Sequence, residues 1–262
     1  MSDTPSVNVA AEDIRARLEV GLRARGAEAC VVTFDGDGTL WSGDVGEDVF
    51  LEAVTERALT EAARPALFEC ALAHQVSTKG DANDIARSIF EAYRAHAFPE
   101  RLVCEVMTWC YAGMTLGDLH TLTRQALTRT SLPSRYNQTL LPLLQFVRDH
   151  GVRTVVISAS PQAIIELAVE PLGFQAEEVV AAVPVVLSGS IQSRMAGPTP
   201  YAEHKVEAGR RHFGDAHWLG CFGDNIFDAE MLRAAEVPVA VSPKPALRAA
   251  LGSVPGIVVL ES

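Results

Sequence analysis

The chain has 262 residues, 48% of them hydrophobic and 21% charged, which is enough for one large core or a core and a smaller second unit. Its formal net charge of -11 argues against general nucleic-acid binding, because that function needs a basic surface. The amino-terminal segment contains acids and lacks an apolar stretch, so we expect no secretory signal. No run approaches the ~18 apolar residues of a membrane span, and the five scattered cysteines show no zinc spacing. These features predict a reduced, cytoplasmic protein without a membrane partner.

Apolar residues at helical spacing predict a first helix over residues 11–25. The β-prone run Val31 to Phe34 then leads directly into Asp35 and Asp37, with glycines between and after the two acids. A short apolar run bounded in this way is typical of a buried parallel strand, whose carboxyl end is where α/β sheets bind ligands. Two carboxylates at that place need a cation or a proton to compensate them. The alternative interpretation is a solvated Asp/Gly turn.

From about residue 46 to residue 132, helical segments follow one another without a strand-like run. They are expected near 46–59, 61–74, 82–97, 99–112 and 115–130. This stretch is too long for a simple crossover between two parallel strands, so it predicts an inserted helical domain. The alternative is that these helices only enlarge the core.

Alternation of helix and strand resumes after the linker Ser131 to Asn137. We expect helices at 139–150, 161–172, 201–213, 226–235 and 244–251, strands at 153–157, 218–222, 237–241 and 257–260, and a strand or hairpin at 179–194. The predicted division is therefore a core of residues 1–44 and 137–262 and an inserted domain of residues 45–136.

Polar residues follow two of these strands. Ser158, with the backbone N–H groups of Ala159 and the next residue, can bind phosphate oxygens, although a helix N-cap is the simpler role for such a serine. Asp224 follows the strand 218–222 and would reach the same sheet edge as Asp35, as a shared Mg²⁺ requires, unless it or Asn225 only caps a helix.

The two acids of the first loop suit two chemical roles. Asp35 can attack phosphorus and form an aspartyl-phosphate, and Asp37 can protonate the leaving oxygen and later deprotonate a water. Gly36 lets backbone N–H groups approach a phosphate closely.

The stretch DGDGT at residues 35–39 resembles the first motif of the haloacid dehalogenase (HAD) superfamily, and the chain looks most like its phosphoserine-phosphatase-like branch. The resemblance implies a Rossmann-like parallel α/β core with an all-helical cap that closes over the active site. It also implies a Mg²⁺-dependent phosphatase acting on a small phosphomonoester.

The same resemblance assigns roles to residues of the other family motifs. Ser158 matches the second motif. Lys205, which alone would be read as a surface lysine, matches the third, where a lysine offsets the charge of nucleophile and phosphate. GDNIFD at residues 223–228 matches the fourth, which implies Asp224 as a metal ligand and Asp228 as a residue that orients it or Lys205. The implied site comprises the catalytic acids Asp35 and Asp37, the phosphate-binding Gly36, Ser158, Ala159 and Lys205, the metal ligands Asp35, Asp37 (through its carbonyl) and Asp224, and the supporting residues Asp228, Asn225 and Thr39.

In phosphoserine-type relatives, an acid nine residues after the nucleophile binds the substrate's amino group, and Asp44 stands at that spacing. Glu47 lies one helical turn further, and Trp41 could offer an aromatic face to a quaternary ammonium. These residues suggest a cationic phosphomonoester such as phosphoserine, phosphoethanolamine or phosphocholine. The alternatives are that Asp44 caps a helix and that Trp41 packs against it.

Four other functions share parts of this pattern. A haloalkanoate dehalogenase needs no second aspartate, so Asp37 speaks against it. A signalling receiver domain is about half this length and lacks a helical insertion. A phosphotransferase would use the same residues, and a non-catalytic phosphate-binding module would use the same scaffold. The sequence does not predict an oligomeric state.

Overall fold

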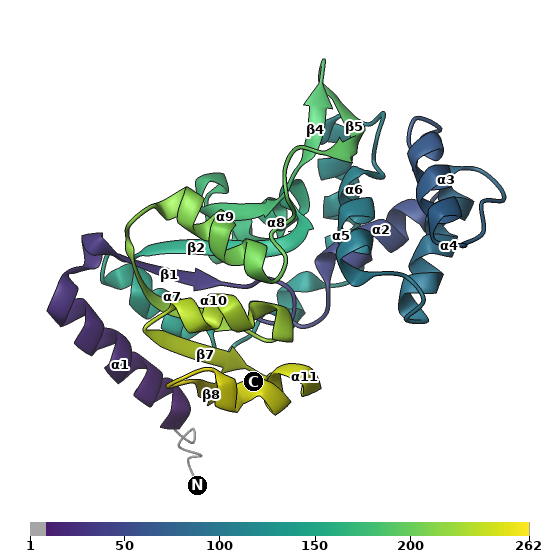
Figure 1. The fold of residues 1–262 in the computed structure, drawn as a ribbon. Coiled ribbons are helices and arrows are strands. Elements are labelled where there is room, and N and C mark those ends of the chain that lie inside the picture. The colour runs from purple at the N-terminus through teal and green to yellow at the C-terminus, as the bar shows by residue number, and fades with distance from the viewer. Residues whose placement is uncertain (1–8, 262) are drawn as a thin grey trace, which may run out of the picture. The chain divides into compact units, whose positions relative to one another are not determined.

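The computed structural model describes residues 9–261, and the first eight residues, which belong to the segment where no secretory signal is expected, lie outside that range. Six strands form one sheet in the order β3-β2-β1-β6-β7-β8 (Figure 1). The strands span Cys30–Phe34 (β1), Arg153–Pro161 (β2), Val179–Ala182 (β3), His217–Gly223 (β6), Val237–Val241 (β7) and Val258–Leu260 (β8). β1 pairs in parallel with both β2 and β6, and β7 pairs in parallel with both β6 and β8. The predicted parallel α/β core is confirmed.

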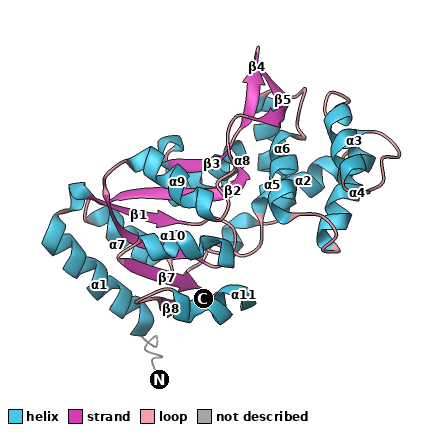
Figure 2. Ribbon diagram, viewed as in Figure 1, coloured by secondary structure: helices cyan, strands magenta, loops and turns pink. Residues whose placement is uncertain are grey.

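Helices flank this sheet and fill the insertion after β1 (Figure 2). They span Val9–Arg25 (α1), Val45–Thr55 (α2), Arg64–Ala73 (α3), Ala82–Arg94 (α4), Glu100–Trp109 (α5), Leu116–Arg129 (α6), Leu141–Asp149 (α7), Gln162–Val169 (α8), Glu203–Phe213 (α9), Ala229–Ala234 (α10) and Pro245–Ala250 (α11). The segment between α2 and the end of α6 contains helices and no strand, so the predicted helical insertion is confirmed.

The chain divides into two compact units. The first comprises residues 9–43, 135–157 and 205–261 of the described chain, and the second comprises residues 44–134 and 158–204. Residues 158–204 thus group with the helical insertion, whereas the sequence placed them in the core. The division into a core and a cap stays a prediction.

In the first unit, β1 is the central strand and is buried along its whole length. Val31, Val32 and Phe34 are fully buried, as expected for a strand covered on both faces. Phe34 is the last residue of β1 and Phe222 is the residue before the last in β6, and their rings stack with centroids 4.8 Å apart. This pair fixes the carboxyl ends of the two strands beside each other.

The amino-terminal end of β6 is tied to the end of α1 by a charged cluster. Glu236 Oε2 lies 3.0 Å from Arg25 Nη2 and 2.7 Å from His217 Nε2. Burial alone would raise the pKa of Glu236, but the hydrogen bonds with these two partners outweigh it and lower that pKa. α1 also packs on β6, β7 and β8, so the cluster fastens a helix that covers one side of the sheet.

The second unit contains a two-stranded antiparallel hairpin of β4 (Pro184–Leu187) and β5 (Ser190–Met195) beside its helices. Ile191 of β5 accepts a hydrogen bond from the backbone N–H of Gly113 at 2.9 Å and donates one to the carbonyl of Met114 at 2.9 Å. The hairpin is therefore held by the loop between α5 and α6, which explains why residues distant in sequence form one unit with the helical insertion.

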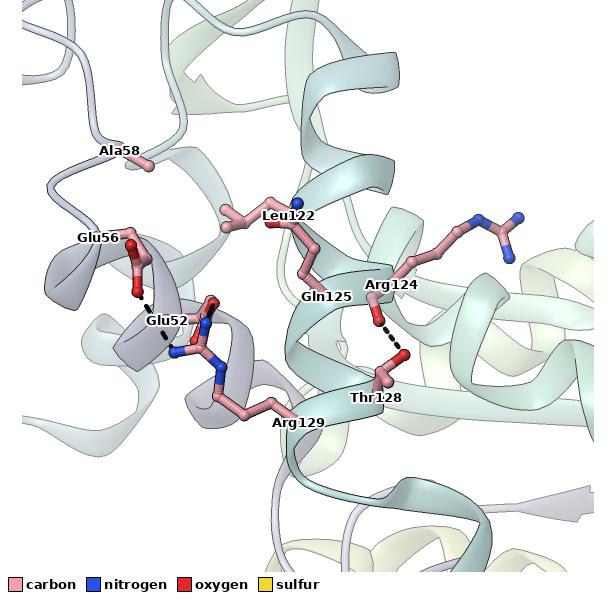
Figure 3. Close-up of a pocket in the computed structure, with 8 residues that line it drawn as sticks. All are labelled: Glu52, Glu56, Ala58, Leu122, Arg124, Gln125, Thr128 and Arg129. Carbon is pink, nitrogen blue, oxygen red and sulfur yellow. Dashed lines mark hydrogen bonds and ion pairs between the residues drawn. The ribbon is translucent and has the colours of Figure 1, made fainter.

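A groove of about 740 Å³ lies between α2 and α6 of the second unit (Figure 3). Arg129 of α6 forms ion pairs there with the buried Glu52 at 2.9 Å and with Glu56 at 3.3 Å. These ion pairs join the two helices. None of the residues predicted for the site lines the groove.

Within residues 9–261, the structure has no helix with both the length and the apolar character that a membrane crossing requires.

Candidate active site

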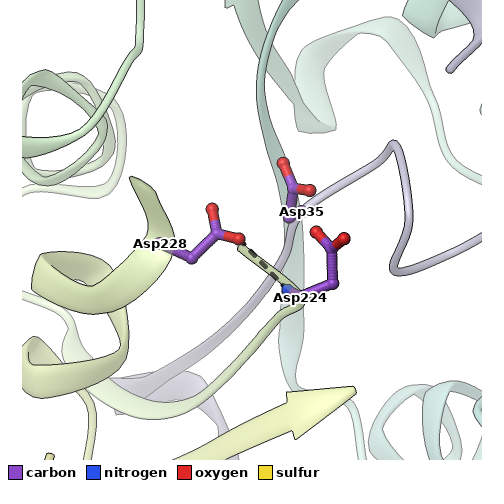
Figure 4. Close-up of side chains that lie close together, drawn as sticks. All are labelled: Asp35, Asp224 and Asp228. Carbon is purple, nitrogen blue, oxygen red and sulfur yellow. Dashed lines mark hydrogen bonds between the residues drawn. The ribbon is translucent and has the colours of Figure 1, made fainter. Parts of the chain in front are cut away.

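Three aspartates converge at the carboxyl end of the sheet (Figure 4). Asp35 follows β1, Asp224 follows β6, and Asp228 ends a short 3₁₀ turn four residues later. Each offers a carboxylate oxygen, and these three oxygens lie within 4.8 Å of one another. β1 and β6 are adjacent and parallel, and the backbone N–H of Asp35 donates to the carbonyl of Phe222 at 2.9 Å, so the pairing of the strands brings the acids together.

Lys205 of α9 is the cation at the centre of this cluster. Its Nζ lies 2.6 Å from Asp35 Oδ1 and 2.5 Å from Asp228 Oδ1, and all three side chains are buried. Burial alone would lower the pKa of Lys205, but the charges of Asp228 and Asp35 outweigh it and raise that pKa, so the ammonium stays charged at neutral pH. Burial also raises the pKa of Asp35 well above its usual value, against the opposing effect of Lys205.

Asp228 has hydrogen-bond partners on both carboxylate oxygens. Oδ1 accepts from Lys205, and Oδ2 accepts the backbone N–H of Asp224 at 3.1 Å and that of Asn225 at 2.9 Å. Asp228 therefore holds both the loop after β6 and the Lys205 side chain in place. This agrees with the supporting role that the resemblance implies for Asp228. Asn225 is also the N-cap residue of the 3₁₀ turn Ile226–Asp228, as the capping alternative expected.

Asp224 differs from Asp228 because only one of its two carboxylate oxygens has a partner within the described chain. Oδ2 lies 2.9 Å from Lys244 Nζ, whereas Oδ1 is buried and has no hydrogen-bond partner within the described chain. Burial, followed by the charge of Asp228, raises the pKa of Asp224 to about 6. A buried carboxylate oxygen beside other carboxylates is the kind of ligand that Mg²⁺ takes, so these residues fit a divalent cation.

Lys244 is a site residue that the sequence did not reveal. It precedes α11, and its backbone N–H donates to the carbonyl of Asp224 at 2.8 Å while its ammonium pairs with the Asp224 side chain. The signal that could have found it is the scarcity of lysine, since the chain has only Lys79, Lys205 and Lys244.

The loop after Asp35 makes a close approach to Asp224. Gly38 has φ +87°, and a Cβ atom at this position would lie 2.1 Å from Asp224 Oδ2, so only glycine fits. The carbonyl of Gly36 accepts the backbone N–H groups of Thr39 at 3.1 Å and of the following leucine at 2.9 Å. Thr39 Oγ1 is buried and has no hydrogen-bond partner among residues 9–261.

Asp37 and Trp41 are joined within this loop. The indole Nε1–H of Trp41 donates to Asp37 Oδ1 at 2.9 Å, and the ring packs edge-on against Tyr136 with centroids 6.5 Å apart. Trp41 is fully buried. Its ring is buried and packs on Tyr136, not on the helix that Asp44 caps among the contacts described, and the predicted contact with a quaternary ammonium stays a prediction.

Ser158 and Ala159 lie in β2, which continues to Pro161, and both belong to the second unit. Ser158 is buried, and its Oγ accepts the backbone N–H of Ser160 at 3.1 Å. The N-cap of α8 is Pro161, so neither serine caps this helix. The predicted phosphate-binding role of Ser158 and Ala159 stays a prediction.

Asp44 caps α2, because its side chain accepts the backbone N–H of Glu47 at 2.8 Å. Glu47 forms an ion pair with Arg94 at 3.5 Å. Both acids belong to the second unit and are partly exposed. The capping alternative for Asp44 is therefore confirmed, and its predicted contact with a substrate amino group stays a prediction.

Comparison with known proteins places this arrangement in a family. A family model described as haloacid dehalogenase-like hydrolase matches residues 32–233, whereas no curated protein matches the chain. Among solved structures, a protein with unknown function from Bordetella pertussis Tohama I has 18% identity and a TM-score of 0.65, over 88% of this chain and 97% of that one. A phosphoserine phosphatase in apo form has 13% identity and a TM-score of 0.53, over 88% and 93% of the two chains. A phosphoserine phosphohydrolase-like protein from Francisella tularensis subsp. tularensis SCHU S4 has 14% identity and a TM-score of 0.53, over 87% and 94%. These likenesses confirm the fold that the motifs implied, and the family match spans most of the described residues. The chain belongs to the haloacid dehalogenase-like hydrolases.

Proposed function

We propose that this protein is a Mg²⁺-dependent phosphatase that hydrolyses a small phosphomonoester through an aspartyl-phosphate on Asp35. The observation that carries the proposal is the contact of Lys205 with Asp35 at 2.6 Å inside a buried cluster that also contains Asp224. A buried carboxylate next to a fixed ammonium is suited to nucleophilic attack on a phosphoryl group, whose charge the lysine then stabilises.

The reaction has two steps that share one acid. In the first, an oxygen of Asp35 forms a bond to phosphorus, the bond from phosphorus to the ester oxygen breaks, and the leaving oxygen takes the proton of Asp37. In the second, the Asp37 carboxylate takes a proton from a water that attacks phosphorus, which releases phosphate and restores both acids. Asp228 holds Lys205 in place throughout, because its Oδ1 accepts the ammonium at 2.5 Å.

Asp35, Asp224 and the carbonyl of Asp37 are the residues that would hold Mg²⁺, and the buried, unpartnered Asp224 Oδ1 within the described chain supports this assignment. Bound there, the ion would neutralise charge on the phosphate oxygens. Lys244 leaves that oxygen available because it pairs with Oδ2 instead.

For the substrate, we propose a phosphomonoester that carries an amino or ammonium group, such as phosphoserine, phosphoethanolamine or phosphocholine. Asp44 and Glu47 support it, being partly exposed acids at the start of α2. Two of the structurally similar proteins are, by their names, a phosphoserine phosphatase and a phosphoserine phosphohydrolase-like protein. Trp41 is left out of this proposal because it is fully buried. A cytoplasmic location also stays a prediction.

The test is a panel of amino-bearing and neutral phosphomonoesters, assayed with Mg²⁺ and with EDTA on the wild type, Asp35→Asn and Asp215→Asn. Asp215 is exposed and serves as the matched control. We expect Mg²⁺-dependent phosphate release that Asp35→Asn lowers by at least about 10³-fold, as for other nucleophile substitutions, and Asp215→Asn leaves unchanged. After acid quenching, mass spectrometry should find a phosphoryl group on the peptide that contains Asp35.

Full activity of Asp35→Asn, or equal activity in EDTA, would exclude the proposed chemistry. Added alcohols distinguish the phosphotransferase alternative, because a transferase would convert them to new phosphomonoesters instead of releasing phosphate.

A further inference from the structure

Trp41 forms hydrogen bonds with two earlier residues of the loop that carries Asp37. The indole Nε1–H donates to Asp37 Oδ1 at 2.9 Å, and the carbonyl of Trp41 accepts the backbone N–H of Gly38 at 2.8 Å. The side chain and the main chain of one residue therefore both hold the segment that contains the acid. The edge-on contact with Tyr136 fixes the plane of the indole ring.

The segment of residues 135–137 also forms hydrogen bonds with this loop. Asn137 donates its backbone N–H to the carbonyl of Leu40 at 2.9 Å and its side-chain amide to the carbonyl of Thr39 at 3.2 Å. Ser42 donates its backbone N–H to the carbonyl of Arg135 at 3.0 Å, and Arg135 Nε donates to the carbonyl of Ser42 at 2.7 Å. Residues 135–137, predicted only as a linker, thus form hydrogen bonds with the residues immediately before and after Trp41.

We propose that Trp41 is a positioning residue for the general acid and base, an inference that rests on the proposed phosphatase function. A hydrogen bond from a buried indole to a carboxylate is directional and charge-assisted, so it fixes the carboxyl plane of Asp37 better than packing alone. With its carboxyl plane held in this way, Asp37 protonates the leaving group and later accepts the proton of the attacking water.

The chain offers a matched control for this hydrogen bond. Trp218 is also a buried tryptophan of the first unit, and its Nε1–H donates to Thr33 Oγ1 at 2.8 Å. Replacing either tryptophan by phenylalanine keeps a buried ring and removes one indole donor, but only Trp41→Phe removes the donor to Asp37.

The experiment compares two phosphomonoesters that differ in their need for an acid. An alkyl phosphate such as phosphoserine has a poor leaving group and depends on protonation, whereas p-nitrophenyl phosphate depends on it much less. We expect Trp41→Phe to lower the single-turnover rate of ester cleavage for the alkyl phosphate by about 10- to 100-fold, since misplacing a catalytic group by about 1 Å costs up to about 100-fold. With p-nitrophenyl phosphate the single-turnover release of nitrophenolate should fall by less than about 3-fold, because this first step needs little help from an acid. The second step uses Asp37 as a base with either ester, so the steady-state kcat is expected to fall with both. Trp218→Phe should lower both rates by the same small factor.

Two further measurements address Trp41 without relying on how well its single variant folds. In Asp37→Ala, the additional change Trp41→Phe should leave the residual rate unchanged, because the acid through which Trp41 acts is gone. The indole N–H resonance of Trp41 in the NMR spectrum should also move in Asp37→Ala, while that of Trp218 stays in place.

Equal losses in the single-turnover cleavage of the two esters, additive effects in the Asp37→Ala background, or an unmoved Trp41 resonance would each overturn the positioning role. If the wild type hydrolyses both esters and one of these results is found, only this inference fails. If the wild type hydrolyses neither ester with Mg²⁺, the proposed phosphatase function fails, and the positioning role fails with it.

Discussion

Replacing Lys205 by methionine removes the positive charge that Asp35 and Asp228 share. The lysine is buried and lies 2.6 and 2.5 Å from the two acids, so methionine keeps most of the volume and deletes the charge. Breaking a buried ion pair costs about 3–5 kcal/mol. The loss is limited because an aspartate without its cation takes up a proton, which at pH 7 costs about 4 kcal/mol for a group of normal pKa. We therefore expect Lys205→Met to lower the free energy of unfolding by about 3–5 kcal/mol at pH 7.

The pH dependence of this loss follows from the acids and not from the lysine. The pKa of Lys205 is raised in the fold, so its stabilising effect is fully present below its unfolded pKa and is lost only as pH rises through the folded value. Between pH 5 and pH 7 the wild-type lysine is charged. At pH 5 the protonation of an aspartate costs only about 1.5 kcal/mol, so the deficit of the variant should shrink to about 1–2 kcal/mol.

The assay is urea-induced unfolding at pH 5 and pH 7 in EDTA, so that no divalent ion replaces the missing charge. Lys79→Met is the matched control, since Lys79 is exposed and its substitution should stay within about 0.5 kcal/mol of the wild type. A deficit below about 1 kcal/mol at pH 7, or an equal deficit at both pH values, would show that Lys205 does not compensate the buried acids.

Two other predictions concern the first unit, and the first of them compares two glycine substitutions. Gly38→Ala places a Cβ atom against Asp224, so calorimetric titration should find Mg²⁺ binding weakened by at least about 10-fold, a 1.4 kcal/mol effect. Gly26→Ala has a similar positive φ with nothing within 4 Å, so it should lower stability through backbone strain alone, and equal Mg²⁺ affinity in the two variants would contradict the close approach. Glu236→Gln should lower the free energy of unfolding by less than about 1 kcal/mol at pH 7, because the pair is partly exposed. The pKa of Glu236 is lowered in the fold, so this difference is present above pH ~4.5 and should vanish as pH falls below it, and a difference that grows in acid would refute the assignment.

The sheet and its acidic edge were predictable because local signals agree with the tertiary fold there. β1 and β6 are largely apolar runs that are each followed directly by an aspartate, and parallel strands must bring their carboxyl ends to one edge. Asp35 and Asp224 meet for that reason. Lys205 was found because lysine is scarce in this chain and because the resemblance to the family supplied a place for it.

The contacts that the sequence did not reveal depend on loop conformation and on the pairing of distant segments. Lys244 reaches Asp224 only because β7 lies beside β6 and ends next to it. For Trp41 the sequence left open contact with a substrate cation and packing on a helix. The contact of its buried indole with Asp37, which the positive φ of Gly38 permits, was not among the expectations. Neither periodicity nor spacing encodes such a contact.

The charges of the buried cluster bear on why it exists. Three carboxylates face two ammonium groups, those of Lys205 and Lys244, so the ionised cluster keeps an excess of one negative charge. A cluster retained only for stability would pair every buried oxygen, or would be replaced by apolar residues at little cost. Instead, Asp228 is paired on both oxygens while Asp224 Oδ1 has no partner within the described chain. A stability cost that the fold tolerates at one particular oxygen is expected where that oxygen has a ligand to bind. The asymmetry between these two aspartates therefore favours a cation-binding function over a purely structural role.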